Sequence, residues 1–327
     1  MEIFFLIFFL GLLFDYTNGF HDAANVVSTV IATKVLKPFV AIGMACIFNT
    51  IGAFQVGPVA ETIASGVVKA ETVNPYLIIA ALCGAIFWNL LTWYFGIPSS
   101  SSYALVGGLI GSAMVHFKEG MILWSTLFSK IVLPMVISPF IGTVVAFLGM
   151  KLAHSIRRYY SLSADHSLFG YLQVGSAALV ALSHGINDAQ KSMGIISLGL
   201  FSAKVIPSLY VPYWVVISCA IVIGLGTASG GFKIIRTMGF QITKLKPVQG
   251  CVTETSASLV ILLSSFFGFP ISSTHMIVGG ITGVGLSQKG RKGVEWGTVR
   301  KVVWAWIFTL PGSAVCSYIL YRFALLV

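Results

Sequence analysis

Two aspartates stand in strongly apolar sequence, each three residues after a glycine. Asp22 belongs to the run GFHDA at 19–23, and Asp188 belongs to the run GINDA at 185–189. An ionised carboxylate at the centre of a membrane helix costs about 2.5 to 3.5 kcal/mol on insertion scales, so another group must offset that cost. We expect each helix to break here, with the aspartate capping the half-helix that follows. A capping role alone is the alternative to one shared site that uses both carboxylates.

Two further polar runs place hydroxyl groups shortly after a proline. FGIPSSSSY covers 95–103 and FGFPISSTH covers 267–275, and each is followed at the same distance by VGG. Unpaired N–H groups at the start of a helix, together with hydroxyls, make a site for an anion. Hydroxyls that bond back to their own helix are the alternative. The candidate ligands for an oxyanion are Ser100, Ser101, Ser102, Ser272, Ser273 and Thr274.

An oxyanion beside two carboxylates is repelled unless a cation or a proton lies between them. An anion that enters a negative interior also works against about 2.3 kcal/mol per charge for each 100 mV. The site therefore implies coupling to Na⁺ or H⁺. For Glu254, expected at the start of a helix, a solvated or capping role is the alternative. The expected coupling residues, with a possible Na⁺ site at the first three, are Asp22, Asn25, Asp188, Asn187, Glu61 and Glu254.

The two aspartate runs differ just downstream, where Asn25 corresponds to Lys191 and Ala24 to Gln190. A residue three positions after an aspartate lies on the same helix face. The Lys191 ammonium therefore either stands where the other half holds a mobile cation or touches the substrate. The alternative is a lysine whose side chain snorkels to the external face of the membrane.

Composition limits the class of protein to which this chain can belong. Of its 327 residues, 57% are hydrophobic and only 9% are charged, against about 25% charged in a soluble domain. These values disfavour a soluble globule, and the net charge of +10 is too scattered for a nucleic-acid surface. The five cysteines are far apart and indicate neither a disulfide framework nor a metal cluster. We expect an all-α polytopic membrane protein whose partner is the lipid bilayer.

Apolar stretches of about 20 residues, long enough to cross a bilayer, must position these groups. Such stretches begin near residues 3, 39, 123, 168, 211 and 302. Two other apolar blocks run into the proline-containing tips and are interpreted as re-entrant helical hairpins. The expected hairpins cover 76–116 and 251–287.

Charge distribution and repetition predict how the spans are oriented. Basic residues gather in 228–248 and 287–301, so both ends of the second hairpin should be cytoplasmic, whereas the first hairpin and both termini should be external. Each half then has three crossings and one hairpin, which is an inverted-topology repeat with broken helices. Recurrent Gly/Ser packing patterns are the alternative explanation of the matching runs. The expected units are a first repeat at 1–150, a cytoplasmic linker at 151–167 and a second repeat at 168–327.

At these runs the sequence closely resembles the inorganic phosphate transporter (PiT) family. The matching segments are NGFHDAAN at 18–25, HGINDAQKSMG at 184–194 and GFPISSTH at 268–275, and the resemblance extends from about residue 11 to residue 310. His21 departs from the Asn of the second run, and Tyr103 departs from the His of the second tip. By position, the resemblance implies phosphate contacts at Ser100 to Ser102 and Ser272 to Thr274, with Asp22, Asn25, Asp188 and Gln190 nearby.

The resemblance implies a secondary active transporter in the cell (inner) membrane and not an enzyme. Inorganic phosphate, alone or as a metal–phosphate complex, would move together with Na⁺ or H⁺ by alternating access, without a resident cofactor. A permease for sulfate or another oxyanion is the nearest alternative. A membrane enzyme acting on lipid phosphates is more distant, because the loops lack a nucleophile and a general acid. A homodimer is compatible with the exposed Gly and aromatic stripes.

Overall fold

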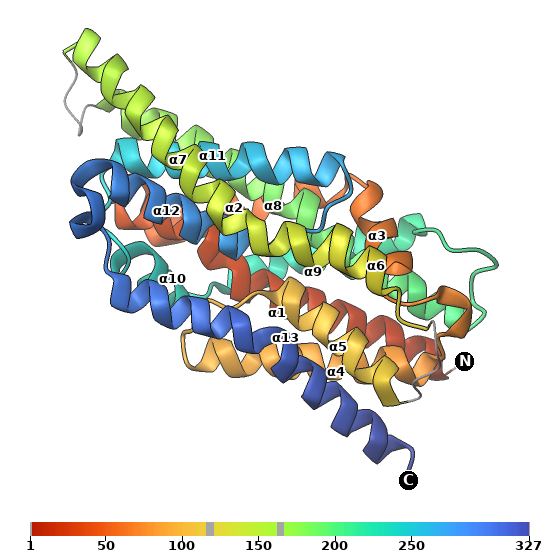
Figure 1. The fold of residues 1–327 in the computed structure, drawn as a ribbon. Helices are drawn as coiled ribbons and strands as arrows, with labels where there is room; N and C mark the ends of the chain where they lie inside the picture. The colour runs from red at the N-terminus through yellow and green to blue at the C-terminus, as the bar shows by residue number, and fades with distance from the viewer. Residues whose placement is uncertain (1, 116–120, 162–166, 327) are drawn as a thin grey trace.

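The computed structural model describes residues 2–115, 121–161 and 167–326, and their secondary structure is helical apart from one isolated bridge between Val68 and Ile122. The order of the helices repeats along the chain (Figure 1). The first series is α1 (Glu2–Ala32), α2 (Pro38–Ala53), α3 (Pro58–Gly66), α4 (Pro75–Tyr94), α5 (Ser101–Val115), α6 (Trp124–Thr126) and α7 (Leu133–Tyr159). The second series is α8 (Ser167–Ser202), α9 (Tyr213–Ser229), α10 (Phe232–Phe240), α11 (Pro247–Phe266), α12 (Ser273–Lys289) and α13 (Trp296–Ala324).

The helices are long and apolar enough for a multi-pass membrane protein. Within the described residues, five helices are long and apolar enough to span a membrane, with Trp124–Tyr159 counted as one, and two bent pairs raise the number to seven. The bent pairs are α2 with α3, at 73°, and α9 with α10, at 71°. Broken spans are therefore present, as predicted.

The breaks do not lie where the sequence predicted them. α1 and α8 run without interruption through Asp22 and Asp188, so the expectation of a helix break and an N-cap at each aspartate is wrong. The chain bends instead at Gly57-Pro58 and at Gly230, whose φ of +66° belongs to the left-handed region that favours glycine. Side chains of α1 and α8 contact the aspartates, so their burial does not require free backbone N–H groups.

The two predicted hairpins are confirmed as pairs of packed helices, α4 with α5 and α11 with α12. Each connecting tip contains a glycine in the left-handed region, Gly96 at φ +66° and Gly268 at φ +76°, followed two residues later by a proline. The second hairpin begins at Pro247, four residues earlier than predicted, and ends at Lys289.

Each hairpin is held by the last long helix of the other series. α13 packs on α4 and α5, whereas α7 packs on α11 and α12. Glycines allow the close approach, because a Cβ at Gly107 would meet the Leu310 backbone and a Cβ at Gly279 would meet the Pro139 backbone. This exchange brings the two tips together at the centre of the molecule.

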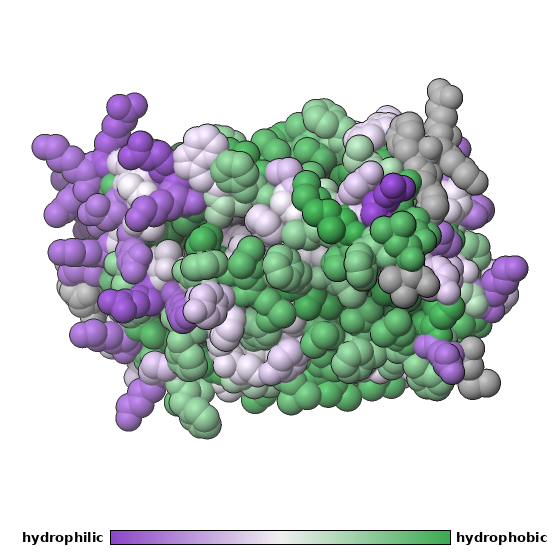
Figure 2. Space-filling model, turned by 90° about the horizontal axis from the view of Figure 1, so that it is seen from below, coloured by the Kyte–Doolittle hydropathy of each residue, from purple (hydrophilic) through white to green (hydrophobic). Residues whose placement is uncertain are grey.

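The surface has an apolar belt between two polar ends (Figure 2). Hydrophilic side chains gather at the end where Figure 1 places the α12–α13 connection and the C-terminal end of α7. The exposed cations of the α12–α13 region are Lys289, Arg291, Lys292, Arg300 and Lys301. The start of α1 and the end of α13 lie at the opposite end (Figure 1).

Candidate functional site

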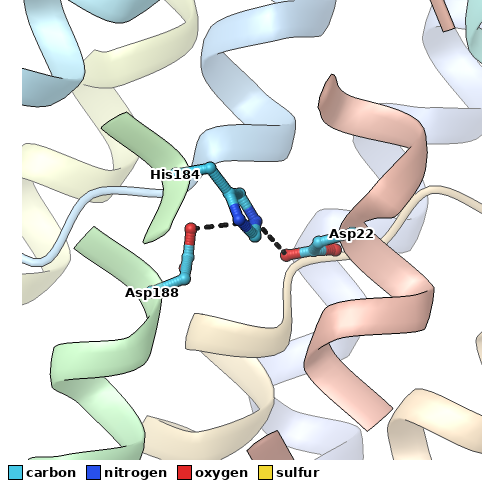
Figure 3. A group of neighbouring side chains, drawn as sticks. All are labelled: Asp22, His184 and Asp188. Atoms are coloured by element: carbon cyan, nitrogen blue, oxygen red, sulfur yellow. Dashed lines mark ion pairs between the residues drawn. The ribbon is translucent and has the colours of Figure 1, made fainter. Parts of the chain in front are cut away.

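Three buried side chains of α1 and α8 meet at the centre of the molecule (Figure 3). His184 Nε2 lies 3.2 Å from Asp188 Oδ2 and 4.0 Å from Asp22 Oδ2, and all three residues are at most 2% exposed. His184 and Asp188 are four residues apart, which places them on one face of α8. His21 Nδ1 approaches Asp22 Oδ1 at 2.7 Å from the other side. The two predicted aspartates are therefore brought together, with an imidazole between them.

Lys191 is buried among the tips and does not reach the membrane surface. Its Nζ donates to Asp188 Oδ1 at 2.5 Å, to Ser102 Oγ at 2.7 Å and to the Ile271 carbonyl at 2.8 Å. The residue is 1% exposed, so the alternative of a snorkelling lysine is wrong. One ammonium thus joins the second aspartate to both hairpin tips.

Asn25 of α1, which corresponds to Lys191 in the repeat, also contacts a hairpin tip. Its Nδ2 donates to Ser273 Oγ at 3.2 Å and to Thr274 Oγ1 at 2.9 Å. The two residues that correspond in the sequence, Asn25 and Lys191, therefore each reach the tip that belongs to the other series.

The remaining predicted tip hydroxyls differ in their contacts. Ser100 Oγ accepts from the Tyr103 N–H and Ser272 Oγ accepts from the His275 N–H, both at 3.3 Å, so these two hydroxyls cap their own helices. Ser101 Oγ is buried and has no hydrogen-bond partner among the described residues. The first turns of α5 and α12 leave N–H groups available. Together with Lys191, this set offers donors to an oxyanion, while the carboxylates offer oxygens to a cation.

Other predicted site residues contact groups outside this cluster. Gln190 accepts from the Ala60 N–H and donates to the Gln55 carbonyl, both at 3.3 Å, so it braces the bend between α2 and α3. Asn187 Nδ2 donates to Ser265 Oγ of α11 at 2.8 Å. Glu61 is exposed on the first turn of α3. The structure does not bring these three residues to the aspartates.

Glu254 has a polar network of its own. The carboxylate is fully buried and accepts from Thr29 at 2.6 Å, Gln173 at 3.0 Å and Ser176 at 2.5 Å. Because α11 begins at Pro247, the expected position of Glu254 at the start of a helix is wrong, and so is the alternative of a solvated or capping role. Thr29 lies two turns after Asp22 on α1, so this network is about 10 Å further along that helix.

Sequence reasoning left two important residues out of the site. His184 is absent from the predicted site, although its spacing of four to Asp188 indicates a shared helix face. Asp15 is fully buried and lies seven residues, or two turns, before Asp22. The same face of α1 therefore carries both acids, a periodicity that could have been found.

A cavity of about 750 Å³ lies between α7, α12 and α13 but is lined mainly by apolar side chains such as Val136, Phe140 and Ile307. It borders Tyr103 and His275, whose rings contact each other. Because it offers few donors or acceptors, the polar cluster is the stronger candidate for a charged substrate.

Residues 18–317 match a family model described as "phosphate transporter family". A protein of Rhizobium meliloti (strain 1021) is 44% identical over 95% of this chain and 93% of its own length. A protein of Bacillus subtilis (strain 168) is 40% identical over 97% and 95%. Both are named "probable low-affinity inorganic phosphate transporter".

The solved structure titled "The sodium-dependent phosphate transporter" matches with a TM-score of 0.90 over the whole of both chains, at 24% identity. That likeness shows the fold. The relatives are named as transporters and not as enzymes. On the family match and on these relatives, the chain belongs to the phosphate transporter family.

Proposed function

We propose that this protein carries inorganic phosphate across the cell membrane together with cations, by alternating access around the two hairpin tips. The observation that carries the proposal is the position of Lys191, whose ammonium touches Asp188, the Ser102 hydroxyl and the Ile271 carbonyl at once. A tetrahedral oxyanion between the tips would meet this cation and the N-termini of α5 and α12.

The phosphate ligands that we propose are hydroxyl and amide groups of the tips. Ser101 offers an unpartnered hydroxyl, while Ser102, Ser273 and Thr274 now bond to Lys191 or Asn25 and would exchange those bonds for bonds to phosphate. Ser100 and Ser272 would act by holding the first turns in place. Gln190 would act indirectly, through the bend between α2 and α3.

Charge supports the coupling to cations. Two carboxylates against one ammonium leave a net negative charge, and a phosphate dianion beside them adds to it. Na⁺ is the cation that we propose, because Asp22, Asp188 and Asn25 supply the oxygen ligands that hard cations prefer, and because the structural neighbour is titled sodium-dependent. Glu254 stays a candidate for a further cation, since its described donors are all neutral.

We also propose that the two halves are inverted in the membrane, with the termini outside and 151–167 inside. Reciprocal contacts between the halves support this arrangement. Thr62 Oγ1 of α3 donates to the Gly268 carbonyl at 2.8 Å, and Thr237 Oγ1 of α10 donates to the Gly96 carbonyl at 3.1 Å. The cations of the α12–α13 connection lie at the end opposite the termini (Figure 1), as cytoplasmic loop charge would.

Uptake of labelled phosphate into proteoliposomes, with Na⁺ and pH gradients imposed separately, tests the coupling. We expect accumulation with an inward Na⁺ gradient alone and little with a pH gradient alone. Accumulation driven only by the pH gradient would replace Na⁺ by H⁺ in the proposal. EDTA in the same assay tests whether a metal–phosphate complex is the transported species.

The substrate itself is tested by competition. Excess unlabelled phosphate should abolish uptake of the label, and excess sulfate should leave most of it. Phosphate at neutral pH carries a proton that it can donate to a carboxylate, which sulfate lacks. Full inhibition by sulfate would favour the broader oxyanion permease.

A further inference from the structure

Asp15 is a buried acid that the central cluster does not use. It is fully buried in α1, and neither carboxylate oxygen has a hydrogen-bond partner among the described residues. None of the ion pairs in the described part of the chain includes it. A carboxylate in this setting is costly unless a cation or a proton neutralises it.

The surroundings of Asp15 are rich in unpartnered oxygens. The Ser192 hydroxyl of α8 faces the carboxylate and is fully buried, and no other hydrogen-bond partner of this hydroxyl lies among the described residues. Asn18 lies one turn after Asp15 on α1, and its Oδ1 is likewise buried and unpartnered. These oxygens come from two helices that pack on each other.

The set is better suited to a metal cation than to a proton. A proton on Asp15 would pair with a single acceptor such as Asn18 Oδ1, whereas a metal cation would be held by the carboxylate, the amide oxygen and the Ser192 hydroxyl oxygen together. Na⁺ accepts several oxygen ligands at once, of the carboxylate, amide and hydroxyl kinds found here. Ser192 follows Asp188 by one turn of α8, so the two acids lie close enough for their charges to interact.

We infer that Asp15, Asn18 and Ser192 form a separate Na⁺ site, between the central cluster and the end of the molecule that holds the termini. This inference rests on the proposed Na⁺ coupling and adds a position for one ion. A cation here would screen Asp15 from Asp188 and would stand about 10 Å from Asp22 along α1. The polar face of α1 that continues through Asn25 leads from this site to the tips.

Binding of ²²Na⁺ to the purified full-length protein, without phosphate, tests the inference. We expect Asp15→Asn to bind one Na⁺ fewer per chain than the parent protein, and Ser192→Ala to weaken that ion by about tenfold, or 1.4 kcal/mol. Ser197→Ala is the matched control, because Ser197 is also a buried, unpartnered serine of α8 but lies five residues away on another face. It should bind Na⁺ like the parent.

Thermal unfolding provides a second measurement that does not depend on counting ions. Asp15→Asn removes an uncompensated charge, so in choline chloride its Tm should exceed that of the parent. Added NaCl should raise the parent's Tm more than the variant's and so close the gap. Equal Na⁺ counts, equal responses to NaCl, or a parent Tm in choline that depends on pH and ignores Na⁺ would each overturn the site.

Phosphate binding separates this inference from the proposed function. If Asp15→Asn binds labelled phosphate in the presence of Na⁺ but binds one Na⁺ fewer than the parent, the new site and the proposed function are both supported. If the parent transports phosphate with Na⁺ but the Na⁺ count of Asp15→Asn equals that of the parent, only the new site fails. Na⁺ bound through Asp15 in a protein that transports no phosphate would overturn the proposed function alone.

Discussion

Asn25 and Lys191 occupy corresponding places in the two halves and reach corresponding targets with different charge. Each follows a buried aspartate by three residues, and each contacts the hairpin tip of the other half. The amide is neutral, whereas the ammonium is a fixed cation. The two halves therefore share the geometry of this contact but not its charge, because an amide makes the contact in one half and an ammonium makes it in the other.

The partners of the two aspartates differ in the same sense. Asp22 lies between the imidazoles of His21 and His184, while Asp188 contacts both His184 and the Lys191 ammonium. We therefore expect the Asp22 side to depend more on a mobile cation and the Asp188 side to depend on its lysine.

The largest effect should come from Asp188→Asn. This change leaves the buried Lys191 ammonium without its counter-charge, a loss that costs about 3–5 kcal/mol in other buried ion pairs. Thermal unfolding should show a large drop in Tm, and uptake should be lost. Asp22→Asn should cost less, because the ion pairs of Asp22 among the described residues are to imidazoles and not to a lysine.

The double variant Asp188→Asn/Lys191→Gln is the control for this prediction. It removes both charges, so it should recover much of the stability lost in Asp188→Asn. A double variant no more stable than Asp188→Asn would show that the ion pair is not the cause.

Lys191→Asn makes the two halves alike and should have the next largest effect. Loss of hydrogen bonds to a charged group costs about 1.5–3 kcal/mol, so the concentration of phosphate for half-maximal uptake should rise by about tenfold or more. With the fixed charge gone, more cations should move with each phosphate. Parallel ²²Na⁺ and labelled phosphate fluxes measure the number of Na⁺ moved per phosphate. An unchanged number would contradict the role of Lys191 as a fixed cation.

The packing of the hairpins can be compared through two glycines. Gly107→Ala and Gly279→Ala each place a Cβ against a backbone carbonyl of α13 or α7, and such overpacking costs about 1–3 kcal/mol. Similar drops in Tm would indicate that both hairpins are held in the same way. Gly43→Ala, which meets nothing within 4 Å, should not destabilise the protein.

The smallest effects should come from the helix caps. Ser100→Ala and Ser272→Ala each remove one N-cap hydroxyl, which costs about 1 kcal/mol. Both variants should show equal, small losses of Tm and keep phosphate uptake. A loss of phosphate binding in either variant, without a change in Tm, would assign that hydroxyl to the substrate.

Local patterns in the sequence were enough to predict the elements and several residues of the central cluster. Apolar length predicted the long helices, and glycine with proline predicted both hairpin tips. The repetition of the aspartate runs predicted that Asp22 and Asp188 share a site, and the structure places both beside His184. These features depend on neighbours in the chain, which a single sequence contains.

The helix breaks were wrongly placed because a buried acid can be satisfied in two ways. The sequence suggested free backbone N–H groups at Asp22 and Asp188, but side chains of His21, His184 and Lys191 contact them instead. Such partners come partly from another helix, and their approach is invisible to local propensity.

The sequence by itself determined which groups are available: the apolar spans, the scarcity of charge, the two acids and the hydroxyl-rich tips. Only the tertiary structure decided which of them meet. Lys191 is buried between the tips, and Gln190 contacts the bend between α2 and α3. Glu61 is exposed, and the Asp15 carboxylate oxygens have no hydrogen-bond partner by distance and angle among the described residues. The reason is physical, since these outcomes depend on how α1 packs against α8 and how α7 and α13 close on the opposite hairpins.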